Sequence, residues 1–187
     1  MERPFTQLSQ LIQAVSQALF PLLNIPFALF GHSLGALISF ELARELCRHY
    51  GVNPVSMFVS SSRAPQLSRP SLVIHTLPDK EFVAELCRLN GTPSEVLEND
   101  ELMEIILPVL RADFALYENY VYEPDFRLDC PISAFGGLND RRVTRCDLEG
   151  WQDQTSVSFS LKMFPGDHFF VNTNESLLLA ALAHELR

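Results

Sequence analysis

The stretch that decides the fold is residues 26–43, which read Pro26-Phe27-Ala28-Leu29-Phe30-Gly31-His32-Ser33-Leu34-Gly35-Ala36-Leu37-Ile38-Ser39-Phe40-Glu41-Leu42-Ala43. Residues 26–30 are a short apolar run between a proline and a glycine, which is typical of a buried parallel strand. Apolar residues then recur at helical spacing through Leu37, Phe40 and Leu46, and Gly51 indicates where that helix ends. The sequence therefore predicts a strand, a tight turn and a helix.

The turn has the pattern Gly-x-Ser-x-Gly, which between a strand and a helix predicts a nucleophile elbow. We expect glycine at 31 and 35 because side chains flanking the serine would collide with the neighbouring strand and helix. This geometry lifts Ser33 Oγ above the sheet. It also directs the backbone N–H of Leu34, at the positive end of the helix, toward the oxygen of a tetrahedral intermediate. Ser33 is therefore the candidate nucleophile, and Leu34 the candidate oxyanion-hole residue.

A serine hydroxyl needs a histidine base and an acid to orient that base. In a fold with such an elbow the chain order is serine, acid, histidine. Asp140 follows a predicted strand over 132–135, and His168 follows another over 157–163. Open parallel sheets place their sites at the carboxyl ends of strands, so we expect Ser33, Asp140 and His168 to meet there.

The four other histidines fit the role of base less well. His32 is the variable position of the elbow and is expected to point away from Ser33 Oγ. His49 ends a predicted helix, and His75 and His184 follow no strand of the predicted sheet. These positions leave His168 as the candidate base.

Two other aspartates compete with Asp140 for the role of acid. Asp167 is the neighbour of His168 in sequence, so its side chain should diverge from the imidazole. Asp147 is the alternative acid, although its position indicates that it opens the next helix.

The rest of the chain predicts one α/β domain over residues 1–187. A helix is expected from about residue 5 to 20, and a further strand over 55–60 joins the three named above. Together these elements predict a mostly parallel sheet with flanking helices. A long helical insert over about 79–122 would lie above the strand ends, so we expect it to act as a lid; an ordinary packing excursion is the alternative.

The charge of the chain excludes some partners. It carries 23 acidic and 14 basic residues, a formal net charge of −9, without a dense basic cluster. Nucleic acids and anionic membrane surfaces are therefore not expected partners. Arg141, Arg142 and Arg145 form a small basic patch that suits an acidic protein or is only a solvated turn.

The cysteines and the apolar segments indicate a cytoplasmic location. The four cysteines include no Cys-x-x-Cys pair, so neither a zinc site nor a disulfide framework is predicted. Residues 18–30 are apolar but contain Pro21, Asn24 and Pro26, which does not fit a signal peptide or a membrane span. Serine-based hydrolysis requires no metal or redox cofactor, so we expect none.

Several separate segments resemble type II thioesterases of nonribosomal peptide and polyketide synthesis. The resemblance rests on residues 27–43 around the elbow and on three further segments, which are Ser61-Ser62-Arg63-Ala64-Pro65, Leu107-Pro108-Val109-Leu110-Arg111-Ala112-Asp113-Phe114 and Phe164-Pro165-Gly166-Asp167-His168-Phe169-Phe170. It runs nearly end to end and implies an α/β-hydrolase fold.

The resemblance implies an editing hydrolase that removes acyl groups from the phosphopantetheine arm of acyl or peptidyl carrier proteins. By that match Ser33 is acylated, His168 is general base and then acid, and Asp140 orients His168. Residues 137–143 match the acid loop of the family, and the helical insert matches its lid, whose apolar face would line the acyl channel.

The chain departs from the family at its amino terminus. Family members carry several dozen further residues there, with the first strands and a Pro-His-Ala-Gly-Gly-like loop that donates the second oxyanion N–H. Met1 falls just ahead of the first predicted helix, so we expect an amino-terminally truncated fold without that donor, whose loss typically lowers rates by ~10²–10³-fold.

Two alternative functions follow from these features. A truncated, non-catalytic remnant could still bind a carrier protein or a partner chain. Acyltransferases of fatty-acid and polyketide synthesis also have a Gly-His-Ser-Leu-Gly elbow, but they typically follow it with glutamate and lack an acid loop of this kind. This chain has Ala36 and Asp140 at these places, which favours a hydrolase.

Overall fold

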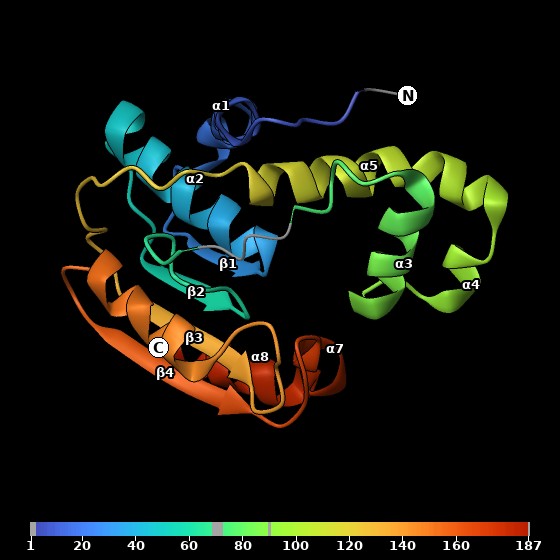
Figure 1. Cartoon of the computed structure of the whole chain (residues 1–187). Coiled ribbons are helices and arrows are strands. Elements are labelled where there is room, and N and C mark those ends of the chain that lie inside the picture. Colours follow the sequence, from blue (N-terminus) through green and yellow to red (C-terminus); the bar gives the residue numbers. More distant parts are fainter. Residues whose placement is uncertain (1–2, 69–72, 90, 187) are drawn as a thin grey trace. The chain divides into compact units, whose positions relative to one another are not determined.

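The computed structural model describes residues 3–68, 73–89 and 91–186, and the chain divides into two compact units (Figure 1). The larger unit contains residues 12–67 and 122–187, and the smaller contains residues 1–11 and 68–121. Each unit has buried apolar clusters of its own. Helix α1 (Leu8–Leu19) begins in the smaller unit and ends in the larger, where η1 (Phe20–Leu22) follows it.

The larger unit is built on a parallel sheet of four strands, in the order β1 (Ala28–His32), β2 (Ser56–Ser60), β3 (Ile132–Gly137) and β4 (Phe159–Phe164). Every pairing between these four strands is parallel. The register places Ser60 beside both His32 and Phe135. The predicted α/β class and the four predicted strands are confirmed, with strand ends shifted by up to two residues.

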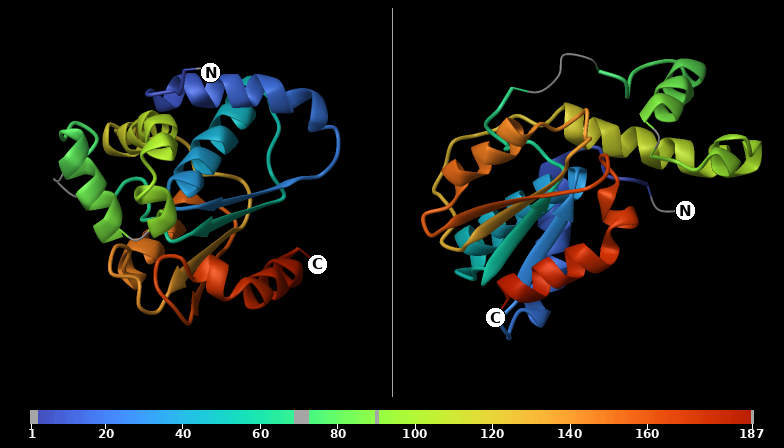
Figure 2. Two further views of the ribbon diagram at one scale, coloured as in Figure 1. Left: turned by 90° about the vertical axis from the view of Figure 1, so that its right-hand side faces the viewer. Right: turned by 90° about the horizontal axis from the view of Figure 1, so that it is seen from below.

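Helices flank this sheet on both faces. They are α2 (Leu34–Tyr50), α6 (Arg145–Glu149), η2 (Gly150–Gln154), α7 (Phe170–Thr173) and α8 (Glu175–Glu185). Figure 2 shows α2 and α8 on opposite faces of the sheet. Helix α2 ends at Gly51 in a left-handed conformation (φ 65°), as its sequence predicted.

The core follows from the alternation of side chains along the strands. Met57, Val59 and Ala134 pack on one face in a cluster with Phe40 of α2 and Trp151 of η2. On the other face the apolar cluster contains three strand residues and three helix residues, which are Phe58, Phe135, Phe164, Phe170, Leu178 and Ala181. Both faces of β2 and β3 are thus buried, which explains why neither strand contains a charged residue.

Trp151 ties the segment after β2 to the core. Its side chain is fully buried, its ring meets Phe40 edge-on with centroids 5.4 Å apart, and its Nε1–H donates to the carbonyl of Ser62 over 2.8 Å. Because a buried indole N–H needs an acceptor, this bond holds the chain just beyond β2 in one place.

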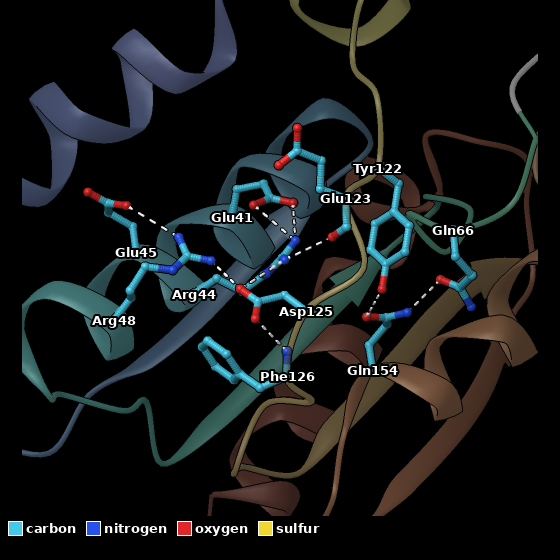
Figure 3. Close-up of polar contacts among 10 residues, drawn as sticks. All are labelled: Glu41, Arg44, Glu45, Arg48, Gln66, Tyr122, Glu123, Asp125, Phe126 and Gln154. Atoms are coloured by element: carbon cyan, nitrogen blue, oxygen red, sulfur yellow. Dashed lines mark hydrogen bonds and ion pairs between the residues drawn. The ribbon is translucent and has the colours of Figure 1, made fainter.

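Arg44 fixes the segment that leads into β3 (Figure 3). Its side chain is 5% exposed, and its guanidinium pairs with Glu41 at 3.0 Å and with Asp125 at 3.2 Å. It also donates to the carbonyl of Glu123 over 2.9 Å, and Arg48 reaches the same Asp125 carboxylate. A buried charge is tolerated when it is paired and hydrogen-bonded, so these contacts anchor residues 123–125 on α2.

The smaller unit holds the helical insert, whose helices are α3 (Asp79–Leu89), α4 (Ser94–Leu97) and α5 (Asp100–Glu118). The side chain of Asn99 caps α5 by accepting the N–H of Leu102 over 3.0 Å. The apolar core of the smaller unit contains Phe82 of α3 and Phe114 of α5, whose rings meet edge-on with centroids 5.6 Å apart. The Glu118 carboxylate accepts the N–H groups of residues 74 and 75, so the unit is closed by side-chain-to-backbone bonds.

Two further features concern the helices and the cysteines. Among the described residues no helix has the length and apolar character needed to cross a membrane. The thiols of the four cysteines are all free.

Candidate active site

The elbow lies between β1 and α2, and Ser33 is the residue at its corner. Ser33 has φ 53° and ψ −117°, a left-handed backbone that residues other than glycine rarely adopt. Its N–H donates to the carbonyl of Ser60 over 2.8 Å, which ties the corner to the end of β2. Strained backbone of this kind is held by its surroundings and is found at functional sites.

The two glycines of the elbow differ in what they do. A Cβ on Gly31 would lie 2.2 Å from the carbonyl oxygen of Gly35, so only glycine lets β1 pass this close to the first turn of α2. At Gly35 itself a Cβ would meet nothing within 4 Å. The expectation that both glycines prevent collisions is therefore right for Gly31 and wrong for Gly35, because the space beside Gly35 is open.

Asp140 lies in a tight turn directly after β3. Its Oδ1 accepts the N–H groups of Arg142 over 2.8 Å and of Val143 over 3.2 Å. The side chain is fully buried. These backbone bonds orient the carboxyl group and leave Oδ2 for another donor.

His168 lies in the loop between β4 and α7 and is 6% exposed. Two bonds hold this loop beside the acid loop: the N–H of Leu138 donates to the Phe164 carbonyl and that of Asn139 to the Gly166 carbonyl, each over 2.8 Å. A Cβ on Gly137 would lie 2.1 Å from the Asp167 carbonyl oxygen. The close approach of the two loops therefore requires glycine at position 137.

The structure brings the three predicted residues together. His168 Nδ1 lies 2.8 Å from Asp140 Oδ2, and His168 Nε2 lies 3.2 Å from Ser33 Oγ. An ionised carboxylate only accepts, so Nδ1 carries the proton and donates it. Nε2 is then left with a lone pair that can accept the Ser33 hydroxyl proton.

The charge of Asp140 is stabilised in place. Burial by itself would raise the pKa of Asp140, but the hydrogen bond from His168, the N–H groups of Arg142 and Val143, and the charge of His168 bring it below its usual value. The carboxyl group therefore stays ionised at neutral pH and can orient the imidazole.

The competing histidines and acids lie elsewhere. His49 pairs with Glu45 in the last turn of α2, and His75 pairs with Glu118 in the smaller unit. His184 is in the last turn of α8. Asp147 takes part in a capping box with Thr144 at the start of α6, as its position indicated, and Asp167 accepts the N–H of Phe169 instead of a histidine proton.

His32 is the part of the site that sequence reasoning missed. Its ring centroid lies 5.1 Å from that of His168, and its Nδ1 lies 3.0 Å from Ser60 Oγ. The sequence predicts only that its side chain points away from Ser33 Oγ, and it predicts neither of these two contacts. Both depend on the register between β1 and β2 and on the path of the His168 loop, and the sequence carries no signal for them.

No group of three or more histidine, cysteine, aspartate or glutamate side chains in the described part of the chain is arranged to hold a metal ion. What the geometry offers is a serine hydroxyl, a base within hydrogen-bond reach and an acid that orients the base, the arrangement of nucleophilic catalysis.

Comparison with known proteins gives one consistent result. The model of the thioesterase domain matches residues 1–185. The gramicidin S biosynthesis protein GrsT of Aneurinibacillus migulanus is 48% identical over 186 residues, which are all of this chain and 73% of that protein.

Solved structures agree with the sequence comparison. RedJ, a thioesterase of the prodiginine pathway in Streptomyces coelicolor, is 38% identical with a TM-score of 0.90 over 98% of this chain and 73% of its own. The type II thioesterase BorB of the borrelidin cluster is 36% identical with a TM-score of 0.90 over all of this chain and 76% of its own. The parallel sheet and its flanking helices are thus those of the α/β-hydrolase fold.

The difference between the two elbow glycines can be tested. We expect Gly31→Ala to prevent folding or to lower the unfolding temperature strongly, because its methyl group would overlap backbone atoms of the first turn of α2. Gly35→Ala should be neutral or stabilising by roughly 0.5–1 kcal/mol, since alanine is favoured over glycine in a helix. The unfolding temperatures of both variants test this prediction. Equal losses of stability would contradict the geometry.

Proposed function

Because this chain belongs to the thioesterase family, we propose that it hydrolyses acyl thioesters through an acyl-enzyme on Ser33, with His168 as base and Asp140 as its orienter. The observation that carries the proposal is the pair of contacts that His168 makes, 3.2 Å to Ser33 Oγ and 2.8 Å to Asp140 Oδ2. Each of the three residues follows a strand of one sheet, and the relatives that the chain matches include proteins named as thioesterases.

The first half of the reaction transfers the acyl group to the enzyme. Ser33 Oγ attacks the thioester carbonyl while His168 Nε2 takes the hydroxyl proton. The tetrahedral intermediate collapses, the carbon–sulfur bond breaks, and His168 returns the proton to the departing sulfur. Free thiol leaves and an ester on Ser33 remains.

The second half regenerates the enzyme. Water attacks the ester carbonyl while His168 Nε2 takes a proton from the water, and the same proton then returns to Ser33 Oγ as the carboxylic acid leaves. In both halves the imidazole carries a positive charge for a moment. The buried Asp140 carboxylate stabilises that charge and keeps the ring in the correct tautomer.

Leu34 is the proposed oxyanion-hole residue. It is the first residue of α2, directly after Ser33, and the first N–H groups of a helix have no acceptor within the helix. Its N–H is therefore available to the negative oxygen of the intermediate, and the positive end of the helix adds to the effect.

The proposed substrate is an acyl group on the phosphopantetheine arm of an acyl or peptidyl carrier protein, and the proposed role is editing in nonribosomal peptide or polyketide synthesis. GrsT is named for gramicidin S biosynthesis and BorB for the borrelidin biosynthetic cluster, and the similar structure YbtT is a type II thioesterase of the yersiniabactin NRPS/PKS pathway. The partner is then a carrier protein and not a nucleic acid or a membrane, and the proposed location is the cytoplasm.

The helical insert over residues 79–122 is the proposed lid. Helix α5 leaves Leu102, Ile105 and Val109 between 40% and 49% exposed, at a spacing that places them along one side of the helix. An apolar stripe of this kind suits contact with an acyl chain.

The chemistry is tested by hydrolysis of an acyl-loaded carrier protein. The purified chain should release free carboxylic acid, which is measured by mass spectrometry. Ser33→Ala should lower the rate of this release by at least about 10⁴-fold. Asp140→Asn should fold normally and still lose activity, because the ring would take the wrong tautomer.

The other outcomes of this assay separate the alternatives. Transfer of the acyl group to a second thiol, without free acid, would indicate an acyltransferase. Binding of the carrier protein without release would indicate a non-catalytic remnant. A Ser33→Ala protein as active as the unchanged chain would refute the proposed mechanism.

The lid is tested on its exposed stripe. Ile105→Asp should lower kcat/KM for a long acyl chain by about 10-fold or more, the loss expected when a charge replaces an apolar contact of a few kcal/mol, and should leave an acetyl substrate unaffected. The matched control is Glu104→Ala, at the residue just before Ile105 in α5, which is also exposed. Equal effects of Ile105→Asp on long and short chains would contradict the lid.

A further inference from the structure

His32 occupies a place in the elbow that links two strands to the candidate base. It is the last residue of β1, and its register partner is Ser60, the last residue of β2. Its Nδ1 lies 3.0 Å from Ser60 Oγ, while the carbonyl of the same serine accepts the N–H of Ser33 over 2.8 Å. The fully buried Ser60 therefore fixes both His32 and the nucleophile.

The ring of His32 lies against the ring of His168. Their centroids are 5.1 Å apart, and the Phe169 ring lies 5.1 Å from His168 and 6.1 Å from His32. His168 thus has an aromatic neighbour in His32 and another in Phe169. Packed rings restrict one another to few rotamers, so these neighbours limit how far the imidazole of His168 can turn.

Packing alone does not explain why a histidine stands at position 32. Its Nε2 is buried and has no hydrogen-bond partner among the described residues, and a buried polar atom without a partner destabilises the fold. A phenylalanine would fill the same space without this loss. What histidine adds is Nδ1, which bonds Ser60 and sets the orientation of the ring.

We infer that His32 is a positioning residue: its ring, oriented by Ser60, packs against the imidazole of His168 and keeps that imidazole between Ser33 and Asp140. The inference rests on the proposed roles of Ser33, His168 and Asp140 and adds a residue to them. His32 is not placed in contact with substrate; it acts through His168.

The charge state of His32 suits this role. Burial lowers the pKa of His32 from 6.5 to about 4, and among the charges around it His168 also lowers it, Asp140 raises it and Arg142 lowers it. The ring is therefore neutral at neutral pH. A second cation at this place would oppose the positive charge that His168 carries during catalysis, so a neutral ring can pack there without disturbing the base.

The test compares two substitutions at position 32. His32→Ala removes the ring, and we expect kcat for thioester hydrolysis to fall by roughly 10–100-fold with KM changed little, because a displaced base misaligns the reaction and not substrate binding. His32→Phe keeps a ring beside His168 but loses the bond to Ser60, so its kcat should lie between that of His32→Ala and that of the unchanged chain. Ser60→Ala keeps the histidine ring and loses the same bond, so its kcat should also lie between those two values.

A second readout follows the position of His168 without activity. The proton between His168 Nδ1 and Asp140 gives a proton NMR signal far downfield of the amide region when the bond is held. We expect a sharp signal in the unchanged chain, a broadened signal in His32→Phe and Ser60→Ala, and the loss of the signal in His32→Ala. If His32→Ala does not fold, Ser60→Ala tests the inference: a kcat as high and a signal as sharp as those of the unchanged chain would overturn it.

The control is His49→Ala, which removes an exposed histidine from the last turn of α2 and should change neither readout. Original kcat and an unbroadened signal in both His32→Ala and Ser60→Ala would overturn the inference, as would equal losses in His32→Ala and His32→Phe. If Ser33→Ala and His168→Ala stay active, the proposed function fails separately, and the NMR signal still decides the role of His32.

Discussion

The close approach of two backbone segments at Gly31 is the constraint on which the site depends. Because a side chain at this position would overlap the carbonyl of Gly35, only glycine lets β1 run directly into α2. The chain turns so sharply there that Ser33 takes a left-handed backbone, which is stable only because the strand and the helix on either side are held by their own packing. The nucleophile is thus positioned by the core of the larger unit.

The parallel sheet converts this local constraint into a site. Parallel strands end at the same edge, so residues that follow β1, β3 and β4 meet although they are far apart in the chain. Ser60, at the end of β2 between β1 and β3, joins the pieces through its carbonyl and its hydroxyl. Gly137 plays a role like that of Gly31, because its lack of a side chain lets the His168 loop approach the end of β3.

Sequence reasoning predicted the strands and the three meeting residues for one physical reason. Ser33, Asp140 and His168 each follow a predicted strand within a few residues, and the chain order of such sites is known, so a linear pattern was enough. Sequence patterns do not predict contacts that depend on strand register. The packing of His32 on His168 is one of these, because it arises only when β1 and β2 are aligned. The open space beside Gly35 was missed because the motif treats its two glycines alike, whereas only the backbone path distinguishes them.

The activation of Ser33 by His168 is the central claim, and a serine-directed fluorophosphonate probe tests it most directly. The claim predicts one covalent adduct per chain, located by peptide mass spectrometry on the fragment that contains Ser33, and almost no adduct when His168 is replaced by alanine. An adduct on another residue, or labelling of Ser33 at an unchanged rate without His168, would contradict the claim, because the 3.2 Å contact between Nε2 and Oγ would then not be what makes the hydroxyl reactive.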